Sequence, residues 1–380
     1  MKKTERDFII RLIKREVVPA IGCTEPIAVA LCVSKAARLL GKEPEKIKVL
    51  LSANILKNAM GVGIPGTGMI GLPIAVALGA LAGNPDYQLE VLKDITSDDV
   101  ERGKQVIAEN RIDIQLKENI AEKLDIEVIM SAGPDETTAI ISGGHTCFVY
   151  EARNGNVLLD ERISAVAEES EEDGSLSLRK VYDFALTAPL EEIDFILDSA
   201  RLNKAAAEAS FKGDYGHSLG KSLRNDNERR VMGDSVFTRI LSYTSGACDA
   251  RMAGAMIPVM SNSGSGNQGI AATLPVVVYA EENQKSREEM IRALVLSHLT
   301  VIYIKQSLGR LSALCGCVVA ATGSSCGITY LMGGGYEEMT YAVKNMVANL
   351  TGMICDGAKP SCAMKLTSGV SAAVFSAMLA

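Results

Sequence analysis

The spacing of apolar and polar residues changes twice along this chain of 380 residues. Residues 1–85 predict two helices, a strand at KIKVLLSANI, a glycine-rich loop and a third helix. Residues 86–180 predict a helix at DDVERGKQVIAEN and then short strands, because stretches such as IDIQLK and LDIEVIMSA alternate apolar and polar residues. From residue 181 the apolar residues recur at helical spacing, and strand signals nearly vanish.

These changes predict an α+β fold in which a mainly helical domain holds a smaller inserted α/β domain. We place the boundaries at residues 1–85, 86–180 and 181–380, with the first and last segments forming one unit. The acidic run EESEEDGS, residues 168–175, predicts a solvated linker at the end of the insert.

Composition and charge exclude several classes of protein. Aromatic residues make up 4% of the chain, there is no Trp, and the net charge is −7, which argues against nucleic-acid binding. The first residues, MKKTERDFIIRLIKREV, are charged and amphipathic and do not resemble a signal peptide, so we expect a cytoplasmic protein. The apolar stretch 69–83 is short for a membrane span, and 311–334 is long enough but rich in Gly, Ser and Cys. Small residues let helices approach closely, so we expect both to be buried core helices. The sequence leaves a homodimer open.

The nine cysteines are unevenly placed, with five of them in the last 66 residues. In a chain without an export signal, such clustering favours metal or redox chemistry over disulfides. Six residues separate Cys355 from Cys362, which fits neither a zinc ribbon nor a ferredoxin run. A [4Fe–4S] cluster held by three dispersed thiolates, with one iron left open, remains compatible with the spacing. The alternative is that these cysteines only fill a helical core.

A further cysteine, Cys23, stands before the helix predicted at TEPIAVAL. Thr24 is the expected N-cap of that helix and Pro26 fits its first turn. Free N–H groups and the helix dipole favour negative charge at this end, so we expect a lowered thiol pKa for Cys23. A small buried residue in a tight turn is the alternative interpretation.

Two more segments predict substrate-binding groups. The loop SNSGSGNQG precedes a helix, and its glycines let backbone N–H groups approach a carboxylate or a phosphate. The side chains that we expect to bind substrate there are Ser263, Ser265, Asn267 and Gln268. Lys57 and Asn58 follow the predicted strand at residues 46–55, and a lysine beside an asparagine can hold a carboxylate.

The SNSGSGNQG loop also resembles the asparagine loop of pyridoxal-phosphate-dependent dehydratases. In those enzymes the Schiff-base lysine lies a few tens of residues upstream. Here no lysine occurs between Lys221 and Lys285, which weakens that interpretation.

Four separated motifs together resemble the cysteine desulfidase family, which is related to the iron–sulfur L-serine dehydratases. They are AIGCTEPIAVAL, NILKNAMGVGIPGTG, SNSGSGNQGIAATLPV and ICDGAKPSC, and the resemblance covers essentially the whole chain. It implies a [4Fe–4S] lyase that splits L-cysteine into pyruvate, ammonia and sulfide, with the helical domain as the catalytic one. It also implies Cys315, Cys355 and Cys362 as cluster ligands, with Cys317 as an alternative to Cys315, and Cys23 as the proton acceptor.

The expected chemistry follows from these assignments. β-Elimination removes the α-proton and draws away the β-substituent, for which an open iron can act as a Lewis acid. Lys57 or Lys359, together with the SNSGSGNQG loop, would hold the carboxylate of the amino-acid substrate. Cys23 could instead be the fourth iron ligand of the resting enzyme. The alternative functions are L-serine dehydration at the same site, a pyridoxal-phosphate lyase, and a non-catalytic amino-acid-binding or sulfur-sensing protein.

Overall fold

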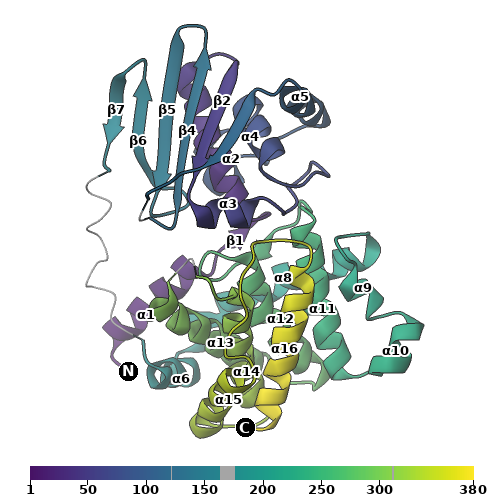
Figure 1. The fold of residues 1–380 in the computed structure, drawn as a ribbon. Helices are drawn as coiled ribbons and strands as arrows, with labels where there is room; N and C mark the ends of the chain where they lie inside the picture. The colour runs from purple at the N-terminus through teal and green to yellow at the C-terminus, as the bar shows by residue number, and fades with distance from the viewer. Residues whose placement is uncertain (121, 163–175, 310–311) are drawn as a thin grey trace.

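The computed structural model describes residues 1–120, 122–162, 176–309 and 312–380. It has two lobes, which we call the sheet lobe and the helical lobe (Figure 1). The predicted α+β class, with a mainly helical part and a smaller part built on a sheet, is confirmed. The acidic run at residues 168–175 lies outside the described residues.

Within the described residues, six strands form the mixed sheet of the sheet lobe. In spatial order they are β3 (Ile112–Leu116), β2 (Lys46–Leu51), β4 (Asp125–Ala132), β5 (Asp135–Ser142), β6 (Phe148–Arg153) and β7 (Asn156–Asp160). β2 and β3 run parallel and the other neighbours run antiparallel. Side chains alternate between the faces of a strand, so Ile47, Val49 and Leu51 of β2 are buried on one face of the sheet.

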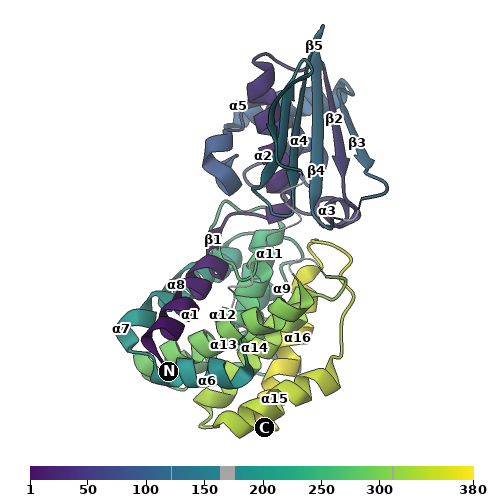
Figure 2. The ribbon, with the colours of Figure 1, turned by 90° about the vertical axis from the view of Figure 1, so that its left-hand side faces the viewer.

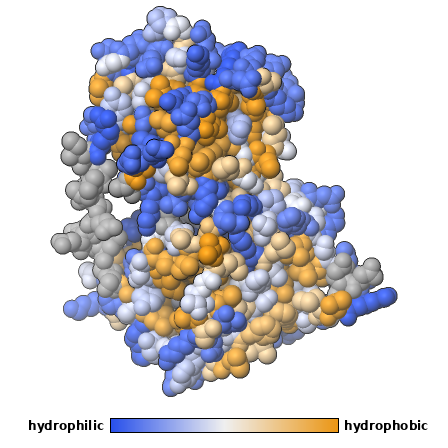
Figure 3. Space-filling model, in the orientation of Figure 1, coloured by the Kyte–Doolittle hydropathy of each residue, from blue (hydrophilic) through white to orange (hydrophobic). Residues whose placement is uncertain are grey.

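Two helices lie on this inner face and a third packs outside them, as Figure 2 shows from the side. They are α2 (Thr24–Leu40) and α4 (Leu72–Leu81) on the sheet and α5 (Ser97–Ala108) against α4, and the short 3₁₀ helix η1 (Pro85–Glu90) joins the last two. α2 is apolar over most of its surface because it lies between the sheet and α4, and residues 28–33 are fully buried. On the opposite face, which is turned to the viewer in Figure 3, hydrophilic residues cover the top of the lobe and apolar residues gather over its middle.

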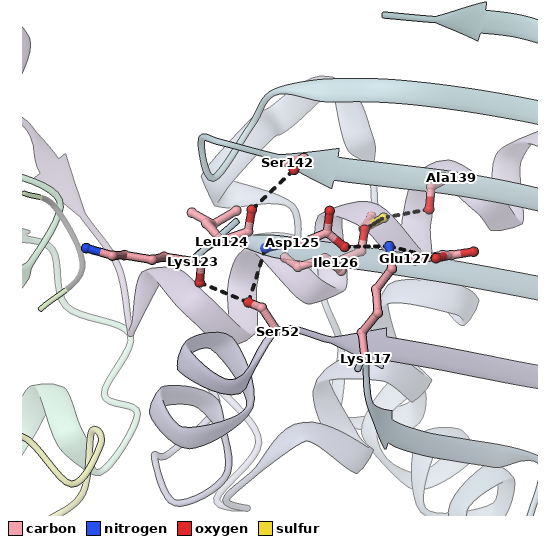
Figure 4. A network of polar contacts seen from close by, with 10 residues as sticks. Ser52, Lys117, Lys123, Leu124, Asp125, Ile126, Glu127, Ala139 and Ser142 are labelled. Atoms are coloured by element: carbon pink, nitrogen blue, oxygen red, sulfur yellow. Dashed lines mark hydrogen bonds and ion pairs between the residues drawn. The ribbon is translucent and has the colours of Figure 1, made fainter. Parts of the chain in front are cut away.

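A polar network ties α3 (Ala53–Ala59) to the middle of the sheet (Figure 4). The hydroxyl of Ser52 accepts from the backbone N–H of Asp125 at 3.2 Å and donates to the carbonyl of Lys123 at 2.9 Å. Lys117 Nζ pairs with Asp125 and Glu127, each at 2.8 Å. α3 therefore begins at a fixed point of the sheet and ends beside the helical lobe (Figure 1).

The helical lobe packs around the helices α12 and α14. Its elements are α1 (Lys3–Glu16), α6 (Leu178–Thr187), α7 (Leu190–Ile193), η3 (Asp194–Ile196), α8 (Leu197–Lys212), α9 (Leu219–Ser222), α10 (Asp226–Met232), α11 (Val236–Met252), α12 (Gly266–Glu282), α13 (Arg287–Leu308), α14 (Gly316–Leu331), α15 (Tyr336–Asn349) and α16 (Cys362–Met378). A Cβ on Gly323 of α14 would lie 2.4 Å from the carbonyl oxygen of Ser297 on α13, so this close approach needs glycine. The apolar stretch around α14 is thus a core helix, and no helix among the described residues is long and apolar enough to span a membrane.

The domain limits at residues 85 and 180 remain a prediction. The packing of residues 1–85, however, divides that segment between the two lobes. β2 lies between β3 and β4, and α2 and α4 pack with the sheet, whereas α1 packs against α13 in the helical lobe. Residues 1–85 therefore contribute to both lobes. The reason is that β2 completes its hydrogen bonds only with strands that come later in the chain.

Candidate active site

A cavity of about 100 Å³ lies where the two lobes meet. Cys23 at the start of α2, Glu25, Asn58 of α3 and His145 of the β5–β6 loop line it from the sheet lobe. From the helical lobe it is lined by Arg251, Ser263, Gly264, Ser265, Asn267, Gln268, Lys305, Ser312, Leu314, Cys315, Gly316, Cys317, Cys355, Gly357, Ala358 and Cys362. The structure therefore brings the predicted Cys23, Asn58, loop residues and ligand cysteines to one place.

A short two-stranded sheet brings Cys23 to the SNSGSGNQG loop. β1 (Pro19–Ala20) pairs antiparallel with β8 (Val259–Met260), and the backbone N–H of Ser261 donates to Val18 at 2.8 Å. The hydroxyl of Thr24 then donates to the carbonyl of Gly264 at 3.1 Å. Two motifs that lie about 240 residues apart in the chain thus share one wall of the cavity.

The state of the Cys23 thiol differs from the prediction. Cys23 itself, and not Thr24, is the N-cap of α2. Burial, followed by the charge of Glu25, raises the pKa of Cys23, and the nearby Arg251 opposes this only in part. The expected lowering of the pKa is therefore wrong, because loss of solvation outweighs the helix dipole. The thiol keeps its proton and donates it to Glu25, with 3.3 Å between Sγ and Oε2.

Glu25, which the sequence did not single out, connects Cys23 to Asn58. The Nδ2 of Asn58 donates to Oε1 of Glu25 at 3.0 Å. Oε2 lies 3.1 Å from the Thr24 hydroxyl, whose single proton it shares with the Gly264 carbonyl. Oδ1 of Asn58 is buried and has no hydrogen-bond partner among the described residues. A carboxylate in contact with a thiol can accept its proton, so this pair can move a proton within the cavity.

Backbone pairing places Cys315 beside Cys355. The N–H of Cys315 donates to the carbonyl of Met353 at 2.7 Å, and the N–H of Cys355 donates to Ala313 at 2.8 Å. Leu314 and Ile354 form the antiparallel bridge between these bonds. Two cysteines that are 40 residues apart in sequence are therefore held on adjacent extended segments.

The pKa of Cys315 is lowered, whereas those of Cys317 and Cys362 are raised. Cys315 is the N-cap of α14, and a hydrogen bond from the Cys317 thiol, aided by backbone N–H groups of Cys317 and Val318, lowers its pKa to about 6. The pKa of Cys317 is raised well above its ordinary value, since Cys317 retains the shared proton. A metal binds the thiolate, which favours Cys315 over Cys317 as a ligand.

Cys362 is the first residue of α16. Burial raises the pKa of its thiol, and Sγ donates to the carbonyl of Gly357 at 3.7 Å. Lys365 and Arg251 lie close enough to favour its thiolate form. Binding a cation there would release the thiol proton.

The donor set fits an iron–sulfur cluster. Cys315, Cys355 and Cys362 line the cavity together with Cys317 and Cys23, and thiolates are the ligands that such clusters require. In the described part of the chain, no three His, Cys, Asp or Glu side chains converge on a point as ligands of a single metal ion. The thiolates of a cluster bind separate irons and need not converge in that way.

The two lysines predicted to bind a carboxylate take other partners. Lys57 Nζ donates to the carbonyl of Cys355 at 3.2 Å, and Lys359 Nζ pairs with Asp356 at 2.9 Å. Neither is among the described residues that line the cavity. Both lysines instead hold the segment that carries Cys355.

The SNSGSGNQG loop forms a tight turn ahead of α12. Asn262 and Ser265 exchange two backbone bonds of 3.1 Å, and Ser263 and Gly264 adopt left-handed φ angles of 48° and 79°. Behind the turn, Asn262 Nδ2 is 3.0 Å from His298 Nδ1. Burial lowers the pKa of His298 to about 3, so this histidine is a neutral support for the loop.

Sequence reasoning missed Glu25, His145, Arg251 and Lys305 as cavity residues. His145 follows Gly143 and Gly144, so a rare histidine on a glycine-rich loop was an available signal. Arg251 lies within an ordinary helical stretch and carried no signal in the sequence. Its importance comes from burial, which depends on the packing of α11 and α12.

Comparison with known families decides the affiliation of this chain. The profile of the family described as serine dehydratase alpha chain matches residues 86–380. The chain belongs to the serine dehydratase alpha chain family. This membership supports a serine dehydratase-like lyase.

Full-length similarity extends to proteins named UPF0597 protein. One from Bacteroides thetaiotaomicron is 74% identical over 380 residues, covering 100% of this chain and 89% of the relative. One from Oleidesulfovibrio alaskensis is 47% identical over 381 residues, with coverage of 100% and 89%. One from Aeromonas hydrophila is 44% identical over 383 residues, with coverage of 100% and 87%. The similarity thus also covers residues 1–85, which precede the range matched by the dehydratase profile.

Proposed function

We propose that this protein is a [4Fe–4S]-dependent β-elimination lyase that converts L-cysteine into pyruvate, ammonia and sulfide. The observation that carries the proposal is that the thiols of Cys315, Cys355 and Cys362 line the same small cavity as Cys23. Membership of the serine dehydratase alpha chain family supports the reaction class. The resemblance of four sequence motifs to the cysteine desulfidase family supports the substrate.

Cys315, Cys355 and Cys362 would hold the cluster, and Cys315 has the thiolate form that metal binding requires. When bound, the cluster supplies an iron without a protein ligand, a Lewis acid for the departing sulfur. Lys57 steadies the Cys355 carbonyl and so keeps this ligand in place.

Cys23 and Glu25 perform the proton transfer. Glu25 accepts the thiol proton of Cys23 along their existing hydrogen bond, and the resulting thiolate takes the α-proton of the substrate. The electron pair of the Cα–H bond forms the Cα–Cβ double bond as the Cβ–S bond breaks. The aminoacrylate released in this way takes up a proton at Cβ, and water hydrolyses the imine to pyruvate and ammonia. Asn58 keeps the Glu25 carboxylate turned toward Cys23 throughout.

L-Serine is the second candidate substrate, because the matching family is that of a serine dehydratase. The same proton transfer applies, with hydroxide leaving from Cβ in place of sulfide. The cavity residues that act on the α-carbon are identical for both amino acids.

The test begins with protein purified without oxygen. Iron and acid-labile sulfide are measured, and pyruvate is then assayed with L-cysteine and with L-serine. We expect about four irons per chain and pyruvate from L-cysteine. Pyruvate from L-serine alone would assign the dehydratase reaction instead. No iron after reconstitution and no pyruvate from either amino acid would overturn the lyase proposal, and a sharp yellow absorbance band would indicate pyridoxal phosphate.

A matched control is available in Cys147, an exposed cysteine next to the His145 loop that is not among the described residues of the cavity wall. Cys147→Ser should keep both iron and turnover. Cys355→Ser should lose both, since it removes a proposed ligand.

A further inference from the structure

Arg251 is a buried cation without a counter-ion. It is 3% exposed, it lines the cavity, and its guanidinium makes no hydrogen bond or ion pair with any residue that the structure describes. A buried charge without a partner destabilises a fold, so such a group persists where a ligand supplies the opposite charge. An anion that enters the cavity would meet Arg251.

The guanidinium lies against the N-terminus of a long helix. α12 has 17 residues, and its N-cap Ser265 makes no side-chain capping bond within the described residues. A Cβ on Gly266 would lie 2.2 Å from Nε of Arg251, so the side chain fits there only because residue 266 is glycine. Open N–H groups at a helix N-terminus favour an anion, and here a cation stands beside them.

Two unpaired acceptors face the same cavity. Oε1 of Gln268, a residue that is 4% exposed, and Oδ1 of Asn58 are both buried without a donor among the described residues. Buried acceptors normally have partners. A ligand that carries N–H groups as well as an anionic group would satisfy both acceptors and Arg251 together.

We propose that Arg251 and the N-terminus of α12 bind the α-carboxylate of an amino acid, while Gln268 and Asn58 accept hydrogen bonds from its ammonium group. This inference deepens the proposed function and rests on it for which amino acid is the substrate. It assigns the carboxylate to Arg251 instead of Lys57 or Lys359. The guanidinium can form two parallel bonds to a carboxylate, so amines without a carboxylate are excluded.

L-Alanine and ethylamine are the probes, because neither has a β-substituent that can leave. Their binding to anaerobically prepared protein is measured by titration calorimetry. We expect wild type to bind L-alanine and not ethylamine. Arg251→Gln should weaken L-alanine binding about 100-fold, and Arg251→Lys about 10-fold, because lysine keeps the charge but not the paired geometry.

Arg239→Gln is the matched control, since Arg239 lies on the same helix and pairs with Asp234 and Glu282 away from the cavity. It should leave L-alanine binding unchanged. Gly266→Ala is a second variant. It keeps Arg251 but adds a methyl group where the Arg251 guanidinium lies, so it should displace the guanidinium and weaken L-alanine binding in the same way. In kinetic assays, Arg251→Gln should raise KM far more than it lowers kcat, because the carboxylate takes no part in bond breaking.

The results separate the inference from the proposed function. L-Alanine binding that depends on Arg251, in a protein that makes no pyruvate, would support the inference and overturn the lyase. Turnover with an unchanged KM in Arg251→Gln would do the opposite. Equal binding of ethylamine and L-alanine, or no L-alanine binding by wild type, would overturn the inference.

Discussion

Sγ of Cys23 lies 3.3 Å from Oε2 of Glu25 and donates its proton to that oxygen. Since burial raises the pKa of Cys23, the thiol depends on this acceptor to become a base. Glu25→Gln should therefore lower kcat by about 10²–10⁴-fold while changing KM little. Steady-state pyruvate formation measures both constants.

Iron content must stay unchanged in Glu25→Gln for that result to report on proton transfer. Glu127→Gln is the matched control, because Glu127 pairs with Lys117 in the sheet and is not among the described residues at the cavity. Full activity of Glu25→Gln would show that Cys23 loses its proton to another group.

The shared proton between Cys315 and Cys317 gives a prediction about which of them binds iron. Cys315→Ser should reduce the iron content from about four per chain to less than about one. Cys317→Ser should keep most of the iron, because the serine hydroxyl can still donate to Cys315 and the thiolate ligand stays in place. Iron analysis after anaerobic reconstitution distinguishes them, and the reverse order of iron loss would assign Cys317 as the ligand.

The bond from Lys57 to the Cys355 carbonyl predicts a role in holding the cluster. Lys57→Met should speed the loss of visible cluster absorbance in air about 3- to 10-fold, as expected for one lost hydrogen bond. KM for the amino acid should stay within about twofold, because the carboxylate binds elsewhere. Lys204→Met, which removes a pair with Glu281 remote from the cavity, serves as the control. A large rise in KM for Lys57→Met would restore the carboxylate role predicted from the sequence.

Asp249 predicts a pH dependence of stability. It is 1% exposed, and its Oδ2 accepts from the N–H of Gly220 at 3.0 Å. Burial raises its pKa to about 6, although backbone N–H groups oppose the shift. The folded protein therefore binds the proton more tightly than the unfolded chain does. The free energy of unfolding should fall by about 1–3 kcal/mol as pH rises from about 4 to about 7 through this group.

Asp249→Asn keeps an oxygen acceptor for Gly220 and removes the titration. Its stability relative to wild type should increase across that pH range, as measured by thermal unfolding at several pH values. Asp214→Asn is the control, since Asp214 pairs with Lys221 at the surface and its pKa is lowered. Parallel pH curves for wild type and Asp249→Asn would contradict the prediction.

The parts of the site that sequence could predict are those carried by rare residue types in close spacing. Cys315, Cys355, Cys362 and the SNSGSGNQG loop all line the cavity, since clustered thiols and glycines restrict what a segment can do. The α+β class was also accessible, because strand and helix periods occupy different parts of the chain.

What the sequence could not predict depends on contacts between distant segments. The direction of Lys57 is set by the Cys355 carbonyl, almost 300 residues away. The pKa of Cys23 is raised by burial in a core cluster that also contains Cys248 and Cys362 of the helical lobe, so the helix dipole alone predicts the wrong direction. Arg251 looks like any helical arginine until the packing buries it and leaves its Nε without a hydrogen-bond partner among the described residues.

The placement of β2 between β3 and β4 has a consequence for how the site is assembled. The family profile begins at residue 86, whereas Cys23, Glu25 and Asn58 come before it, and the connection 82–96 supplies none of the described residues of the cavity. Two pieces of one chain therefore pair as two subunits would, because the N-terminal piece inserts β2 into a sheet made by the other piece. A cut in the 82–96 connection would leave a split protein whose halves complement each other at the active site.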